Sequence, residues 1–197
     1  MDTRGFTLLE LMIVIAIMAV ISALSYVALD SSIVSMNTAA LKADVMDELR
    51  NTMMLMTQQL QLAAKEGNNS LNPPLEGVAI VQNPAQLSPV EIVFQIPLDD
   101  TGLNWSRPIH LRHINGDING DGNVTRRVVR MQDLNGDGVI DPVTETFPLG
   151  AANNITDVQF ARNGDLITVT LTAEKQASTR RMETITATLT GQVYLLN

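Results

Sequence analysis

The chain has 197 residues, a formal net charge of −8 at pH 7 and no cysteine. Its basic residues are scattered, so it lacks the basic stripe of a nucleic-acid surface, and we predict no nucleic acid among its partners. Without cysteine it forms no disulfide, no iron–sulfur cluster and no thiol nucleophile. Only 4% of the residues are aromatic, which predicts a core of aliphatic side chains and methionine.

The chain starts with a few charged residues and continues as a long apolar segment. Arg4, Gly5 and Phe6 precede Glu10, and residues 11–29 carry no charge. At a rise of 1.5 Å per residue, this segment spans about the 30 Å hydrocarbon core of a bilayer. An ordinary secretory leader has a shorter apolar segment, with its small-residue cleavage site after that segment. Here the notable small residue, Gly5, comes before the span.

Residues 4–11, Arg-Gly-Phe-Thr-Leu-Leu-Glu-Leu, resemble the leader junction of the type IV pilin superfamily residue for residue. The resemblance implies cleavage between Gly5 and Phe6 by a prepilin peptidase. It also implies methylation of the new amino terminus at Phe6 and a mature protein that keeps the apolar helix. In this superfamily a glutamate stands at the fifth mature position, which is Glu10 here.

Glu10 also has a physical role that does not depend on the resemblance. After cleavage the α-amine of Phe6 is a cation at the membrane face, and a carboxylate one helical turn further on can meet it, in the same subunit or in a neighbour. In a helix bundle this pair lowers the desolvation cost of both charges. A simpler interpretation is that Glu10 only complements the positive end of the helix. We predict the assembly role, because the simpler one does not explain the adjacent Gly5 and Phe6.

Residues 30–66 are predicted to continue the helix as an amphipathic second half. No proline or glycine interrupts residues 6–66, which predicts one helix about 90 Å long. An apolar stripe recurs at steps of three and four residues: Leu41, Val45, Leu49, Met53, Met56, Leu60 and Ala63. We expect this stripe, together with Met46 and Met54, to pack on the head, and Gly67 to end the helix.

Residues 67–197 predict a β-rich head that follows a leader at 1–5 and a membrane-spanning, assembling half-helix at 6–29. Alternating apolar and polar residues predict strands at 78–81, 91–96, 124–132, 158–161, 166–173 and 185–195. Asn163-Gly164-Asp165 predicts a hairpin turn, and residues 175–181 a loop. The predicted fold is therefore α+β, with a long N-terminal helix packed on an antiparallel sheet.

The end of the chain carries a second, less specific resemblance. Residues 154–160 and the closing strand to Asn197 are similar to the tails of W-type minor pilins and J-type minor pseudopilins. Many major pilins carry a terminal disulfide loop, which a chain without cysteine cannot form. This favours the minor pilin or pseudopilin groups.

A hexapeptide with alternating oxygen-bearing side chains occurs twice within the segment 115–145. Oxygen ligands at positions 1, 3 and 5, with glycine at 6, begin a calcium loop. The candidate ligands of the second copy are Asp133, Asn135, Asp137, the Val139 carbonyl and Asp141. Those of the first copy are Asp117, Asn119, Asp121 and Asn123. Thr144 stands at position 12 of the second copy with Glu145 one later, so the loops resemble dockerin loops more than EF-hands. Alternatively, both copies are plain hairpin turns, which Asn-Gly and Asp-Gly form unaided.

The spacing of the titratable residues suggests no catalytic site. His110 and His113 would point to opposite faces of a strand, which disfavours joint metal binding. No serine, histidine and acid grouping is apparent, and Glu91 is interpreted as an ordinary surface acid. We therefore predict that the protein is not an enzyme.

The combined prediction is a structural subunit of a type IV pilus or a type II secretion pseudopilus, assembled through Phe6 and Glu10. The alternative is a calcium-dependent, adhesin-like head on the same anchor. Expected partners are other pilin or pseudopilin subunits, a prepilin peptidase, an inner-membrane assembly platform and, before assembly, membrane lipid. The expected location is the inner membrane, with a cytoplasmic N-terminus and the head outside, followed by an extracellular or periplasmic filament.

Overall fold

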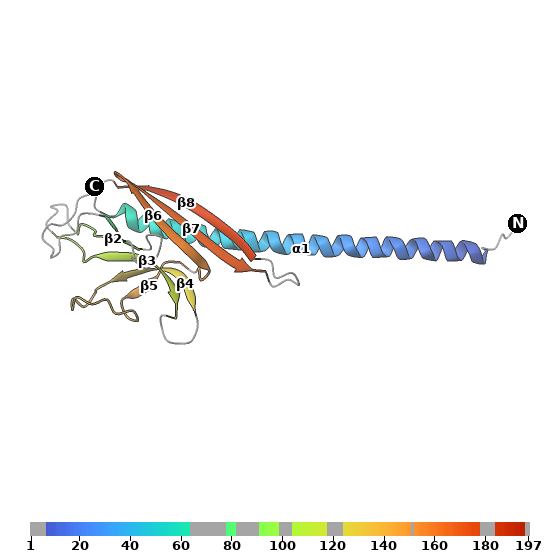
Figure 1. Cartoon of the computed structure of the whole chain (residues 1–197), viewed down its shortest axis with the longest axis horizontal. Coiled ribbons are helices and arrows are strands. Elements are labelled where there is room, and N and C mark those ends of the chain that lie inside the picture. The colour runs from blue at the N-terminus through green and yellow to red at the C-terminus, as the bar shows by residue number, and fades with distance from the viewer. Residues whose placement is uncertain are drawn as a thin grey trace.

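The chain folds into one long helix that projects from a head of two antiparallel sheets (Figure 1). The computed structural model describes residues 7–63, 78–81, 91–98, 104–117, 124–150, 152–177 and 184–195. The predicted leader 1–5 and Gly67 lie outside these residues. The long helix and the antiparallel head confirm the predicted α+β fold.

The helix α1 runs from Leu8 to Gln61 and is 54 residues long. Thr7 caps its start, because its side-chain oxygen accepts a hydrogen bond from the Glu10 N–H at 3.3 Å. The helix ends earlier than the predicted residue 66. The N–H of Leu62 donates to the Gln59 carbonyl at 3.3 Å, and the N–H of Ala63 donates to the Leu60 carbonyl at 3.1 Å. These bonds span three residues, as in a 3₁₀ turn, and Ala63 is buried in the core.

The predicted apolar stripe of α1 packs on the head. Its buried members are Val45, Leu49, Met53, Met56, Leu60 and Ala63. Leu41 is only half-buried, because it stands at the margin of the head. The expectation for Met54 was wrong, since 61% of this residue is exposed. One residue is a 100° turn of the helix, so Met54 points away from the face that its neighbour Met53 buries.

The head combines a five-stranded and a three-stranded sheet, both antiparallel. The first has the order β1-β2-β3-β4-β5, with β1 (Ala79–Val81), β2 (Glu91–Phe94), β3 (Ile109–Gly116), β4 (Thr125–Gln132) and β5 (Thr146–Pro148). The second has the order β6-β7-β8, with β6 (Ile155–Asn163), β7 (Leu166–Gln176) and β8 (Thr184–Tyr194). In Figure 1, β7 and β8 lie along the head-proximal part of α1, which they contact. A core of mostly aliphatic side chains and methionine, which also contains Phe94 and Phe160, joins the helix to both sheets.

Two details of the strands differ from the sequence prediction. Lys175 belongs to β7, which continues to Gln176 instead of ending in a loop. Strand β2 ends at Phe94 and not at the predicted residue 96, and Val93 is buried although it alternates with the buried Ile92 and Phe94. Val93 lies on a central strand, paired with a residue on each side, so neighbouring strands shield it. The predicted hairpin turn is confirmed: Gly164 follows β6 with φ +60°, and β7 begins two residues later.

A charged contact also ties the head to the helix. Lys175 of β7 forms an ion pair with Asp44 of α1, and its Nζ lies 3.5 Å from Oε1 of Glu48, one turn further along the helix. These carboxylates raise the pKa of Lys175, mainly through the hydrogen bond to Asp44. The sheet is therefore held to the helix by this contact as well as by the apolar stripe.

Candidate functional site

The first half of α1 is an apolar surface that the head leaves uncovered. The helix is long and apolar enough to cross a bilayer, and none of its most apolar stretch is buried. The large apolar side chains exposed there include Leu11, Ile13, Ile15, Ile17, Ile21, Leu24, Val27 and Leu29. Burial of such side chains, in lipid or against other helices, is favourable by roughly 25 cal/mol for each Å² removed from water. The structure therefore supports membrane anchoring through α1.

Glu10 lies in the first turn of this apolar helix. This first turn is the end of α1 that projects away from the head (Figure 1). Gly5 and Phe6, the predicted processing residues, lie outside the described part of the chain. Contact between Glu10 and the amino terminus therefore stays a prediction.

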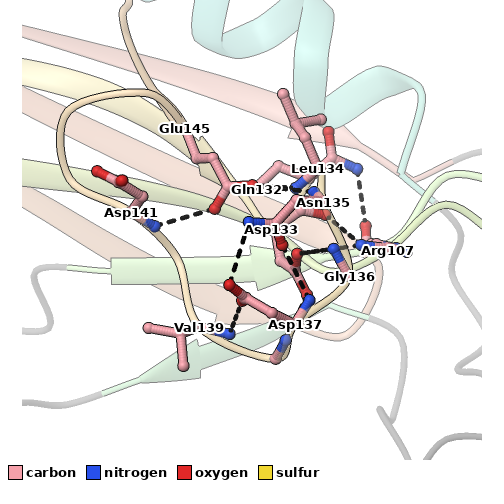
Figure 2. A network of polar contacts seen from close by, with 11 residues as sticks. Arg107, Gln132, Asp133, Leu134, Asn135, Gly136, Asp137, Val139, Asp141 and Glu145 are labelled. Atoms are coloured by element: carbon pink, nitrogen blue, oxygen red, sulfur yellow. Dashed lines mark hydrogen bonds and ion pairs between the residues drawn. The ribbon is translucent and has the colours of Figure 1, made fainter.

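The second acidic loop follows β4 and turns on two glycines (Figure 2). Gly136 has φ +86° and Gly138 has φ +83°, a region that favours glycine. Both donate their N–H to the Asp133 carboxylate, at 2.5 and 3.1 Å. These bonds lower the pKa of Asp133, the one from Gly136 contributing most. Asp133, the first residue of the loop, therefore stabilises the turn.

The next candidate ligands repeat this pattern of side chains that accept backbone N–H groups. Oδ1 of Asn135 accepts from Asp137 at 2.9 Å, and Oδ1 of Asp137 accepts from Val139 at 2.8 Å. Asp141 accepts from Val143 at 2.7 Å, which is the largest cause of its lowered pKa. The oxygens that calcium would use thus already stabilise the loop.

Glu145 is the residue of this loop that the sequence prediction left outside the ligand pattern. It is 3% exposed, and Figure 2 shows its carboxylate turned inward. Oε1 accepts the N–H groups of Leu134 and Asn135, at 2.7 and 3.0 Å, and Oε2 accepts that of Asp141 at 2.9 Å. The sequence did contain a signal for this role, because Glu145 is a glutamate near the end of the acidic loop. It was left out of the ligand pattern because it stands one position after the place that an EF-hand requires.

Arg107 supplies a positive charge at the loop. Its Nη1 lies 3.0 Å from Oδ1 of Asp133 and donates to the backbone oxygen of the same residue at 3.1 Å. A Cβ at Gly136 would lie 2.2 Å from Nη2 of Arg107, so a side chain there would displace the guanidinium, and the positive φ itself favours glycine. The guanidinium partly neutralises the loop, and a bound cation would compete with it for Asp133.

The first acidic loop is described only at its start. Asp117 is exposed directly after β3, whereas Asn119, Asp121 and Asn123 lie outside the described residues. The two loops adjoin opposite ends of β4. In the part of the chain that the structure describes, no group of three or more histidine, aspartate or glutamate side chains could hold a metal ion.

A second polar feature lies beside the acidic loop, on the β2–β3 pair. The register places Glu91 opposite Arg112, two residues beyond His110 on β3, and Nδ1 of His110 forms a short diagonal hydrogen bond with the Glu91 carboxylate. This bond is the main cause of the lowered pKa of Glu91. The pair lines a groove of about 630 Å³ with Asp133 and residues 138–140. Glu91 is therefore more than an ordinary surface acid, and only the strand register reveals this.

His113 is separated from His110, as alternation along the strand predicts. Its Nε2 lies 2.8 Å from the carbonyl oxygen of Ile155, so it links β3 to β6 of the other sheet. The two histidines do not form a joint metal site. Each has a separate contact within the head.

Comparison with known proteins identifies the N-terminal segment. Residues 1–26 match the family described as the prokaryotic N-terminal methylation motif. No curated protein and no solved structure matches the chain. The match includes Gly5, Phe6 and Glu10 and most of the apolar segment, and it supports a leader of the type IV pilin class. Together with the projecting apolar helix, it fits a pilin-like or pseudopilin subunit.

Proposed function

We propose that the protein is a structural subunit of a type IV pilus or a type II secretion pseudopilus, cleaved before Phe6 and methylated there. The apolar half of α1, uncovered by the head, is the observation that carries this proposal. In a filament this surface packs against the same segment of other subunits, which replaces the lipid that covers it before assembly. The tail resemblance favours a minor pilin or minor pseudopilin.

The attachment of α1 to the head suits this role. The buried stripe and the contact of Lys175 with Asp44 and Glu48 hold the second half of the helix against β7 and β8. A force applied along the helix therefore reaches the head through side-chain packing. The N-terminus faces the cytoplasm and the head faces outward in this proposal, with a prepilin peptidase and an inner-membrane platform as partners.

The experiment is to express the full chain with its peptidase and assembly platform, and to compare it with Glu10→Gln. We expect the mature protein to begin at Phe6 and the amount of sheared filament to fall at least tenfold in the variant. An unpaired amine at the membrane face is costly, which is the reason for the loss. Asp47→Asn, an exposed change on the head-proximal half, is the matched control. A start other than Phe6, or filaments unchanged by Glu10→Gln, would contradict the proposal.

We also propose that the loop 133–145 binds calcium weakly. Four carboxylates occur in this single loop: Asp133, Asp137, Asp141 and Glu145. Each carboxylate has about four lone-pair sites, so the bonds to backbone N–H groups leave acceptor capacity for a hard cation. Among the described residues no cluster of acidic side chains converges on one point, and Arg107 already pairs with Asp133, so we expect an affinity near the millimolar range of extracellular modules.

The calcium proposal is tested on the full chain in detergent, by titration calorimetry and by thermal unfolding in calcium or in chelator. We expect calcium to raise the unfolding temperature, because a ligand that binds only the folded state stabilises it by mass action. Asp141→Asn is expected to weaken the effect, whereas Asp47→Asn keeps it. Identical unfolding curves in 10 mM calcium and in chelator would refute the proposal.

A further inference from the structure

Two lone charges stand on the exposed part of α1. Between residues 11 and 43 the only charged side chains are Asp30 and Lys42, which have opposite signs. Both are exposed, and neither has a hydrogen bond or ion pair in the part of the chain that the structure describes.

The two residues cannot pair with each other within one helix. Twelve residues separate them, which is about 18 Å along α1, whereas side chains on one helix interact at spacings of three or four residues. The unbroken helix from Leu8 to Gln61 keeps this separation fixed. Because no described residue of the same chain pairs with either charge, another subunit is the natural source of a partner.

The other acidic residues of the head-proximal helix already have basic partners. Asp44 and Glu48 contact Lys175, and Asp47 lies 3.3 Å from Arg50. Glu10 lies twenty residues before Asp30, about 30 Å away, which is the thickness of the hydrocarbon core. Asp30 thus marks the far edge of the span from Glu10.

We propose that Asp30 of one subunit forms an ion pair with Lys42 of a neighbouring copy, the two parallel α1 helices being offset by about 18 Å. The proposal rests on the proposed function, in which the exposed half of α1 packs against other copies. Such packing removes water from both charges, and a charge buried without a partner costs far more than a paired one. The loss of water between the packed helices therefore favours the offset at which the two charges meet.

This contact uses different residues on its two sides. Each subunit gives its Asp30 to one neighbour and its Lys42 to another, so the interface is heterologous. A heterologous contact that does not close into a ring generates an open helical array. The subunit nearer the membrane contributes Lys42, and the one already raised contributes Asp30.

The first test is a double-mutant cycle in the full chain, expressed with its assembly machinery. We expect Asp30→Asn and Lys42→Gln each to lower filament yield at least fivefold, because each leaves the other charge unpaired in the interface. The double variant is expected to yield no less than either single variant. Yield is measured per inserted and processed subunit, so a defect in insertion does not enter the result.

The matched control is the same cycle with Arg50→Gln in place of Lys42→Gln. Arg50→Gln removes a charge that is already paired with Asp47 in the same helix. We expect Arg50→Gln to leave yield unchanged, alone or with Asp30→Asn. Independent, multiplicative losses for Asp30→Asn and Lys42→Gln, or no loss for either, would overturn the proposal.

The second test measures the offset directly, and the absence of native cysteine makes it clean. Subunits with Ser31→Cys are mixed in membranes with subunits carrying Ala43→Cys, and disulfide-linked dimers are counted after oxidation. We expect dimers from this mixture and at least fivefold fewer from Ser31→Cys mixed with Ser35→Cys. The opposite preference overturns the 18 Å offset.

The two tests also separate this inference from the proposed function. If Glu10→Gln abolishes filaments while Asp30→Asn and Lys42→Gln do not affect them, the ion pair is refuted and the subunit role remains. If Glu10→Gln leaves filaments intact, the proposed function itself fails.

Discussion

Replacing Glu145 tests whether this buried carboxylate closes the acidic loop. The side chain accepts three backbone N–H groups, from Leu134, Asn135 and Asp141, at distances of 2.7 to 3.0 Å. Glu145→Ala removes all three acceptors. A hydrogen bond to a charged group contributes about 1.5–3 kcal/mol when both partners are buried. Leu134 and Asn135 are exposed, so water replaces part of the loss.

We therefore expect Glu145→Ala to lower the free energy of unfolding by about 3 kcal/mol. Glu145→Gln keeps one oxygen but turns an NH₂ group toward a backbone donor, which predicts a loss of about 1.5 kcal/mol. Chemical unfolding of the full chain in detergent measures both values. Amide hydrogen exchange at Leu134, Asn135 and Asp141 should accelerate in the alanine variant.

The matched control is Asp137→Asn, an exposed change in the same loop that should stay within about 0.5 kcal/mol of the wild type. All measurements are made in chelator, so that the result concerns the loop and not a bound cation. Unfolding free energies equal to that of the wild type for both Glu145 variants would refute this account. Unchanged exchange at the three amides would do the same.

Three further predictions concern the head and its attachment to α1. Gly191→Ala places a Cβ 2.6 Å from Sδ of the buried Met53, so we expect chemical unfolding to show a loss of about 1–3 kcal/mol. Gly116→Ala, which has open space around the new Cβ, should leave the stability unchanged. Equal effects of the two substitutions would contradict the close approach of Gly191 to Met53. Lys175→Gln should lower the free energy of unfolding by at most about 1 kcal/mol. Because the pKa of Lys175 is raised in the folded state, the ion pair contributes at neutral pH and is lost as the pH rises through the folded-state pKa. A difference from the wild type that persists above this pKa would count against the ion pair. Glu91→Gln should lower the free energy of unfolding at pH 7. Because the pKa of Glu91 is lowered in the folded state, the difference from the wild type should vanish as the pH falls through this lowered pKa. A difference that is independent of pH would refute the charged hydrogen bond.

Features with local signals were predictable from the sequence. The apolar segment, the Gly5-Phe6 junction with Glu10, and the hairpin at Gly164 each depend on residues close together in the chain. The buried stripe of α1 was also predictable, because helical periodicity decides which side chains share a face. Met54 shows the limit, since apolar character alone did not reveal which face it occupies.

The contacts of the candidate sites depend on residues that lie far apart in the sequence or on a loop path that spacing rules do not describe. Glu91 meets His110 only because of the register between β2 and β3. Lys175 meets Asp44 only because β7 packs on α1. The inward turn of Glu145 follows from the path of its own loop, which departs from the spacing of a regular calcium loop.

The sequence by itself determined the long apolar N-terminal helix, the methylation motif at its start and the α+β class of the chain. The tertiary structure decided that the head divides into two sheets, where α1 leaves the head, and which acids are buried with partners. The physical reason is one of range. Cleavage motifs, turns and apolar periodicity act over a few residues, whereas strand register and helix–sheet packing are set by the burial of the whole core.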